Sequence, residues 1–168
     1  SAERLAGPRR AREELERIAL LGYGCELCAA LAPESAPAEK LHGLLLAWLE
    51  FLEAPEPIGP AARPALEAKA LTFAGLMPSI ARCAACGELL EEPIVFDPEA
   101  GGALHARCGG GSPVRLAGLR ALEVARRTPL AEGGRLPPID LPRWLLGGFV
   151  TWHLGRPLQS RALLEALG

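Results

Sequence analysis

Residues 83–112 read CAACGELLEEPIVFDPEAGGALHARCGGGS. This stretch decides the fold prediction because its residue pattern differs from the helical pattern on either side of it. Two cysteines three positions apart open it, and a histidine and a cysteine three positions apart nearly close it. Between these pairs, the short β-like runs 93–96 and 103–105 flank a turn rich in Asp, Pro and Gly at 97–102. This pattern is typical of a β-hairpin. The stretch therefore predicts a hairpin with ligand-type side chains at both ends.

Four side chains in this stretch have metal-ligand spacing, namely Cys83, Cys86, His105 and Cys108. Two ligands three apart on a tight turn can face one ion, and two such turns complete a tetrahedron. Gly87 and Gly109 follow the two pairs, as expected where the turn needs dihedral angles that are costly for other residues. Three thiolates and one imidazole suit Zn²⁺ better than a hard cation or a [4Fe–4S] cluster. The prediction is a structural zinc site; the alternative is two buried cysteines with an unrelated surface histidine.

Outside this stretch the pattern is helical. The chain is 49% hydrophobic and only 5% aromatic, and this composition favours helices packed through aliphatic side chains. Apolar residues at helical spacing predict helices over 9–31, 37–54, 61–76, 114–127, 141–154 and about 160–167. The fold class is mainly α, a helical bundle with an inserted zinc-ribbon β-hairpin at about 83–112. We expect residues 1–168 to form a single domain.

Local signals set the expected ends of these helices. Pro8 suits the first position of the first helix, on whose apolar face we expect Leu15 and Ile18. Ser112-Pro113 has the form of an N-cap followed by a first helical residue, and Asp140 can cap the helix from 141. The Gly- and Pro-rich stretch 128–138 predicts a loop.

Charge is unevenly distributed. The formal net charge is −2, but from Arg107 onward nine arginines face four acidic residues, a balance of +5. Such a basic segment favours an anionic partner, either a nucleic acid or an acidic peptide. The alternative is that these arginines only solvate helix surfaces. No apolar run approaches the roughly 20 residues of a membrane-spanning helix, and no secretory signal is visible, so we expect a cytoplasmic protein.

Other chemical motifs are weak. Cys25 and Cys28 form a second C-x-x-C, but they lie in a helical pattern without the βαβ context of a redox motif, so we interpret them as packing residues. His42 and His153 lie in leucine-rich helices without a catalytic neighbour, and we expect structural roles. No phosphate-binding loop, G-x-S-x-G or H-E-x-x-H motif is present, which argues against an enzyme.

The order of several segments resembles the bacterial recombination mediator family RecO. The resemblance rests on Cys83-x2-Cys86-Gly87, the run 96–102 (FDPEAGG), His105-x2-Cys108, Ser112-Pro113 and the run 155–161 (GRPLQSR), and it covers the chain from about residue 20. The family more often has cysteine where this chain has His105. RecO-like proteins begin with an OB-fold of short strands. Nothing here is typical of one, so the chain looks like the C-terminal part alone.

The resemblance implies a non-catalytic adaptor. Such a protein works with RecR and the single-strand-binding protein SSB, acts on single-stranded DNA, helps to load RecA and anneals complementary strands. The expected partner-binding residues are arginines of the basic segment: Arg115, Arg120, Arg126, Arg127, Arg156 and Arg161. Among them, Arg120 and Arg127 would share a helix face beside an apolar groove, as an acidic peptide with an apolar end requires. The alternatives are a zinc-ribbon nucleic-acid or transcription-associated module unrelated to recombination, and, more remotely, a redox protein using Cys25 and Cys28.

Overall fold

The computed structural model describes residues 2–35 and 38–168, and this part of the chain contains seven helices and one three-stranded sheet. The elements in order are α1 (Ala2–Leu31), α2 (Glu39–Glu53), α3 (Ala62–Phe73), β1 (Ile94–Asp97), β2 (Gly102–His105), β3 (Ser112–Val114), α4 (Leu116–Arg127), α5 (Leu130–Gly133), α6 (Leu145–Leu154) and α7 (Gln159–Leu167). The predicted fold class, mainly α with a small β-hairpin unit, is confirmed.

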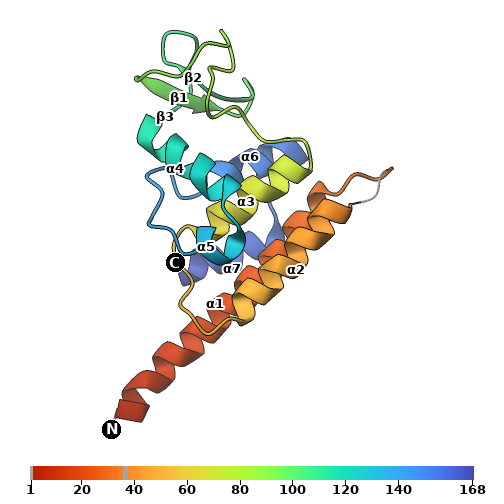
Figure 1. The fold of residues 1–168 in the computed structure, drawn as a ribbon, viewed down its shortest axis with the longest axis vertical. Helices are drawn as coiled ribbons and strands as arrows, with labels where there is room; N and C mark the ends of the chain where they lie inside the picture. The colour runs from red at the N-terminus through yellow and green to blue at the C-terminus, as the bar shows by residue number, and fades with distance from the viewer. Residues whose placement is uncertain (1, 36–37) are drawn as a thin grey trace.

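The helices form one body and the strands form a separate unit at its end. Figure 1 shows α1 and α2 side by side along one flank, with the sheet at the end of the molecule opposite the N-terminus. Helix α3 occupies the centre, where it contacts α1, α2, α4, α5 and α6. The sheet therefore rests on the helical body, and the metal-ligand residues lie away from the main helical core.

The pairing of α1 with α2 depends on one aromatic side chain. Trp48 is fully buried, and its indole Nε1–H donates to the Leu20 carbonyl oxygen at 2.9 Å. A Cβ on Gly24 would lie 2.5 Å from the Trp48 ring, so only glycine lets the two helices approach this closely. Arg17 ties the C-terminal end of α2 to α1 by donating to the Leu52 carbonyl oxygen at 2.6 Å. This contact satisfies a carbonyl that the helix itself leaves unpaired.

The centre of the body also contains a buried polar network. Glu67 of α3 is 1% exposed; its Oε2 accepts from the Tyr23 hydroxyl at 2.6 Å and its Oε1 from Arg63 at 2.7 Å. Burial raises the pKa of the Glu67 carboxyl, against the opposing effects of Arg63 and the Tyr23 hydrogen bond. The carboxyl is thus held by two donors from different helices, as buried ionisable groups require.

The sheet is antiparallel with β1 in the middle, in the order β2-β1-β3. Ile94 pairs with His105 on one side and with Val114 on the other. The expected hairpin of β1 and β2 is therefore confirmed, but the interpretation of Ser112-Pro113 as a helix start is wrong. Those residues form the edge strand β3, because pairing with β1 outweighs the local capping signal.

The sheet is joined to the helices by two contacts. A Glu92 carboxylate oxygen accepts from the Leu116 backbone N–H at 2.9 Å and so caps α4 from outside. Phe96 of β1 packs edge-on against Phe149 of α6, with ring centroids 6.3 Å apart. The residue that caps α4 thus comes from the segment before β1, far from the position that the local sequence indicated.

Two other helix starts also differ from expectation. Helix α1 begins at Ala2, so Pro8 lies inside it rather than at its first position. Helix α6 begins at Leu145, not Leu141, and Asp140 does not cap it. Pro142 gives the physical reason, because the residue before a proline is disfavoured in the helical region. The start expected at Pro37 lies outside the described residues, and α2 runs from Glu39.

The remaining differences concern helix ends and exposure. Helix α3 ends at Phe73 because Gly75, at φ +75°, closes a Schellman motif in which Leu76 N–H donates to the Leu71 carbonyl oxygen. The expected loop 128–138 contains the one-turn helix α5. Leu15 and Ile18 are 43% and 66% exposed, so they do not join the buried face of α1. None of the helices in the described ranges has the length and apolar character needed to cross a membrane.

Candidate metal centre

The four predicted ligands come together between two turns. Cys83 and Cys86 lie on the turn before β1, His105 is the last residue of β2, and Cys108 lies on the turn that follows it. Their ligand atoms all lie within 4.8 Å of one another. This spacing suits a single ion bound by all four side chains.

The first turn is held by its own backbone. Cys83 N–H donates to the Glu88 carbonyl oxygen at 2.8 Å, and Gly87 N–H donates to the Cys83 carbonyl oxygen at 2.9 Å. Gly87 has φ +79°, a conformation that L side chains rarely adopt. The Cys86 N–H points at the Cys83 sulfur at 3.4 Å. Such N–H···S contacts favour a thiolate over a thiol, so the turn is organised around an ionised sulfur.

The second turn follows directly from the sheet. His105 ends β2, and Cys108 N–H donates to its carbonyl oxygen at 2.8 Å. Gly109 does not have a positive φ, so the expected conformational reason for this glycine is wrong. A Cβ at position 109 would lie 2.7 Å from a Leu104 methyl carbon, so the flexible Leu104 side chain would have to shift.

Both ring nitrogens of His105 have the surroundings expected of a metal ligand: one faces the sulfurs and the other a backbone carbonyl oxygen. The side chain is 1% exposed, with Nδ1 3.4 Å from the Cys86 sulfur and 3.9 Å from the Cys108 sulfur. Its Nε2 lies 2.9 Å from the Leu89 carbonyl oxygen, a group that can only accept a hydrogen bond. The proton therefore belongs on Nε2, and the Nδ1 lone pair faces the three sulfurs. Histidine ligands are commonly fixed in this way by an outer hydrogen bond.

The shifted pKa values of the Cys83 and Cys108 thiols also favour a bound cation. Burial acts to raise the pKa of the Cys83 thiol, but backbone N–H groups of Cys86, His105 and Ala85 outweigh it, and the pKa is lowered to about 6. Burial, together with the neighbouring Cys83 and Cys86 sulfurs, raises the pKa of Cys108. One thiolate is thus favoured and further ionisation is opposed, unless a cation compensates the charge. The residues present fit a metal ion.

The second C-x-x-C behaves differently. Cys25 is exposed and Cys28 is buried, and both lie within α1. Burial, with a smaller contribution from Cys25, raises the pKa of the Cys28 thiol to about 11. A thiol with a raised pKa is a poor nucleophile and a poor ligand, because the thiolate is the reactive form. This favours the interpretation of Cys28 as a packing residue, whereas the exposed Cys25 does not pack in the core.

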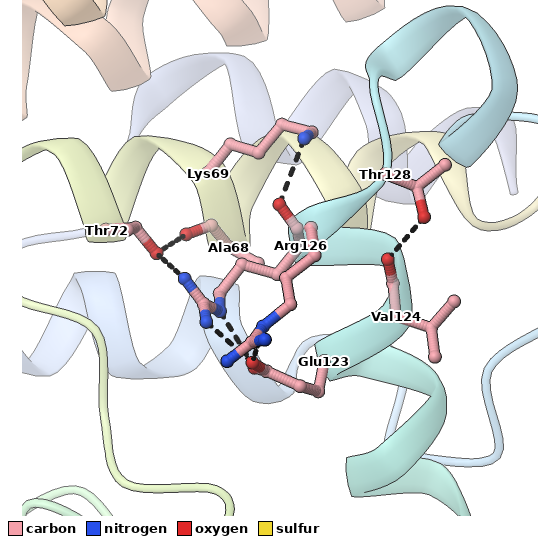
Figure 2. Close-up of polar contacts among 8 residues, drawn as sticks. Ala68, Lys69, Thr72, Glu123, Val124, Arg126 and Thr128 are labelled. Carbon is pink, nitrogen blue, oxygen red and sulfur yellow. Dashed lines mark hydrogen bonds and ion pairs between the residues drawn. The ribbon is translucent and has the colours of Figure 1, made fainter.

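The predicted partner-binding arginines do not form one cluster. Arg126 and Arg127 both contact Glu123, each at 2.6 Å. Figure 2 shows the contact between Arg126 and Glu123. Arg126 also reaches Thr72 at 3.5 Å, and Lys69 donates to its carbonyl oxygen at 3.0 Å. Figure 2 therefore shows a contact between α3 and the C-terminal end of α4, where cations also complement the helix dipole. The sequence pattern indicated neither Lys69 nor this role for Arg126.

The other four arginines differ in their surroundings. Arg115 is 3.9 Å from Asp140, and Arg161 is 2.7 Å from Glu165 with its guanidinium 4.5 Å from the Trp144 ring centre. Arg120 and Arg156 are exposed. His42 and His153 are also exposed, so neither supports the core.

Sequence reasoning missed a pocket of about 440 Å³ in the helical body. Its walls include the apolar side chains of Leu122, Ile139 and Leu146, and its cations include Arg63 and Arg143. The segment around Pro142 contributes to the pocket because it does not extend α6. A sequence pattern could not show this, since the lining residues come from α1, α3, α4, α6, α7 and two connections.

Fold and site together define a helical-bundle protein that carries an inserted Cys3His ribbon suited to a metal ion. Residues 12–162 match the family described as Recombination protein O C terminal, and the chain belongs to this family. The DNA repair protein RecO of Anaeromyxobacter sp. (strain K) is 40% identical over 167 residues, covering 94% of this chain and 65% of the relative. RecO of Myxococcus xanthus (strain DK1622) is 39% identical over 171 residues, covering 98% and 68%. The chain thus spans about two thirds of the length of these curated relatives.

Proposed function

We propose that this chain is the C-terminal, non-catalytic part of a recombination mediator, which binds single-stranded DNA, RecR and the C-terminal tail of SSB to help load RecA and anneal strands. The observation that carries the proposal is the family match over residues 12–162. The curated relatives are each called DNA repair protein RecO. A cytoplasmic location follows from the same proposal.

The metal in this proposal is Zn²⁺, held by Cys83, Cys86, His105 and Cys108. A set of three sulfurs and one nitrogen within 4.8 Å supports this choice, because zinc accepts tetrahedral thiolate and imidazole ligands. Bound zinc would supply structural stabilisation, with all four positions taken by protein. Two of these residues also hold the turns together: His105 through its hydrogen bond to the Leu89 carbonyl oxygen, and Cys83 through its backbone hydrogen bonds.

The arginine-lined pocket is a stronger candidate for the SSB tail than the face of α4. An acidic peptide with an apolar end needs a hollow with apolar walls and a cation at its mouth. The pocket combines Leu122 and Ile139 with the exposed Arg143. Its lining also includes Glu16 and Glu67, of which Glu67 is paired with Arg63. On α4, Glu123 already neutralises part of the charge of Arg126 and Arg127. Contact of the tail with Arg120 and Arg127 stays a prediction, ranked below contact with Arg143.

Titration with an SSB-tail peptide tests this ranking. We expect R143E to weaken binding about 10-fold, since a charge-assisted contact contributes on the order of 1–3 kcal/mol. The matched double variant R120E/R127E should weaken it by about twofold, and both effects should shrink as salt rises because exposed charges are screened. Equal binding by R143E and the parent would place the site elsewhere.

The same experiment separates the proposal from a zinc-ribbon nucleic-acid module unrelated to recombination. We expect binding to the tail peptide and to single-stranded DNA, and weaker binding to duplex DNA of equal length. Binding to duplex DNA with no affinity for the peptide would favour the unrelated module. Because both candidates bind zinc, metal content alone does not distinguish them.

A further inference from the structure

Trp152 is a half-exposed aromatic ring held in a fixed position. The side chain is 51% exposed, although tryptophan usually buries most of its surface. It lies in the last turn of α6. Figure 1 shows this helix at the end of the helical body that carries the sheet. One side of the residue therefore faces solvent in a region that the metal centre does not use.

A stack of rings orients this tryptophan. Trp152 stacks on Phe149 with ring centroids 6.2 Å apart and an angle of 25° between the planes. Phe149 is 6% exposed and packs edge-on against Phe96 of β1. The aromatic series runs from the sheet to the surface, so the exposed Trp152 ring is supported from below. A ring held in this way loses little freedom when a flat partner stacks on it.

The charge around this ring selects the class of partner. From residue 141 to residue 164 the sequence has no aspartate or glutamate, but it has Arg143, Arg156 and Arg161 as well as His153. Arg161 is paired with Glu165, whereas Arg156 is exposed just beyond Gly155, which ends α6 at φ +74°. Against the effect of burial, hydrogen bonds from Ser160 and Gln159 and then the charge of Arg156 lower the pKa of the Glu26 carboxyl on α1. An exposed aromatic ring followed four residues later by an exposed arginine, in a segment of the sequence without acids, suits an anionic chain with flat groups. Single-stranded nucleic acid has both features.

We propose that Trp152 is a stacking platform for one base of a single-stranded nucleic acid, with Arg156 contacting an adjacent phosphate. The inference rests on the proposed function and adds to it a contact residue outside the metal centre. Base–aromatic stacking tolerates any base, because every base has a π-face. The platform therefore predicts binding without strong sequence preference.

The test compares a 12-nucleotide oligothymidylate with an abasic strand of the same length. We expect W152A to bind oligothymidylate about 5- to 150-fold more weakly than the parent, which is the range that one stacked base supplies. W152F should retain most of the affinity. L163A, which truncates another exposed apolar side chain at 44% exposure, is the matched control and should bind like the parent. On the abasic strand, the parent and W152A should bind equally.

Each other outcome overturns the inference. If W152A binds oligothymidylate as the parent does, Trp152 is no platform, while the proposed function stands. If W152A loses affinity equally for both strands, the ring acts through the backbone or through the fold, which a thermal midpoint below that of the parent would reveal. If the parent binds neither strand, the inference fails together with the DNA-binding part of the proposed function. Loss of binding to the SSB-tail peptide in W152A, with DNA binding intact, would identify a protein-docking surface instead.

Discussion

The ribbon and the helical body hold their shapes by different means. The ribbon, residues 79–114, places four ligand side chains around one point, and its six buried large apolar side chains join the core of the helical body. The body itself buries Trp48 and many aliphatic side chains, such as Leu66 and Leu71, between its helices. We infer that the ribbon depends on a metal ion and the body on apolar burial, because a small unit cannot exclude enough water by itself. Three predictions test this contrast.

The largest effect should follow removal of the metal. We expect one zinc per chain by elemental analysis, and we expect chelation or C83S to unfold the ribbon while the helical circular dichroism of the body persists. Ligand binding supplies most of the folding free energy of small metal units, so hydrogen exchange in residues 83–108 should accelerate by about 100-fold or more.

The matched control for this experiment is C25S, since Cys25 is an exposed cysteine outside the cluster. It should keep the zinc content and the exchange rates of the parent. A folded sample without zinc, or a thermal midpoint that chelation does not change, would contradict the proposed dependence of the ribbon on metal.

Truncation of a core side chain should destabilise the helical body and leave the metal content of the ribbon unchanged. Leu66 is fully buried in α3, so L66A should lower the free energy of unfolding of the body by about 2–5 kcal/mol in denaturant titrations. Zinc content should stay at the parent value. L46A, at a position 55% exposed on α2, should cost no more than about 0.5 kcal/mol. Loss of zinc in L66A would show that the two regions fold as one unit.

The smallest effect concerns the surface contact between α3 and α4. Hydrogen bonds from Arg126 lower the pKa of Glu123, against the effect of burial and with further help from Arg127. A carboxyl with a depressed folded-state pKa stabilises the fold above its unfolded pKa of about 4.3, and this contribution is lost as the pH falls below that value.

E123Q should therefore lower the free energy of unfolding by about 0.5–1 kcal/mol at pH 7. Its difference from the parent should shrink toward zero near pH 3, as followed by thermal midpoints. A difference that stays constant with pH would mean that Glu123 acts through packing and not through its charge. The ribbon should be unaffected at pH 7, which a constant zinc content would show.

Local patterns were sufficient to predict which four Cys and His side chains come together, and to predict most helices. The spacing of Cys83, Cys86, His105 and Cys108 is a property of two tight turns, each of which is built from adjacent residues. Helix α7 likewise begins at Gln159, one residue from the start that the sequence predicted. Such features need few long-range contacts to form, so the sequence indicates them directly.

Features set by packing between distant segments could not be predicted in this way. The outer hydrogen bond of His105 goes to Leu89, sixteen residues away, and nothing in the spacing of the ligands predicts it. The role of Arg126 between α3 and α4 depends on Lys69 and Thr72, more than fifty residues earlier. The sequence showed a basic segment, but not which of its charges were already paired.

The sequence by itself determined the fold class, the grouping of four Cys and His side chains that could hold a metal ion, and the approximate extent of the helices, because these depend on periodicity and on short spacings. The tertiary structure alone decided that Ser112–Val114 is a strand and that Leu15 and Ile18 face solvent. It also decided that Trp152 lies on a stack of rings. The physical reason is that hydrogen bonding to β1 and packing between distant helices contribute more free energy than local propensity, and a local pattern does not contain those distant partners.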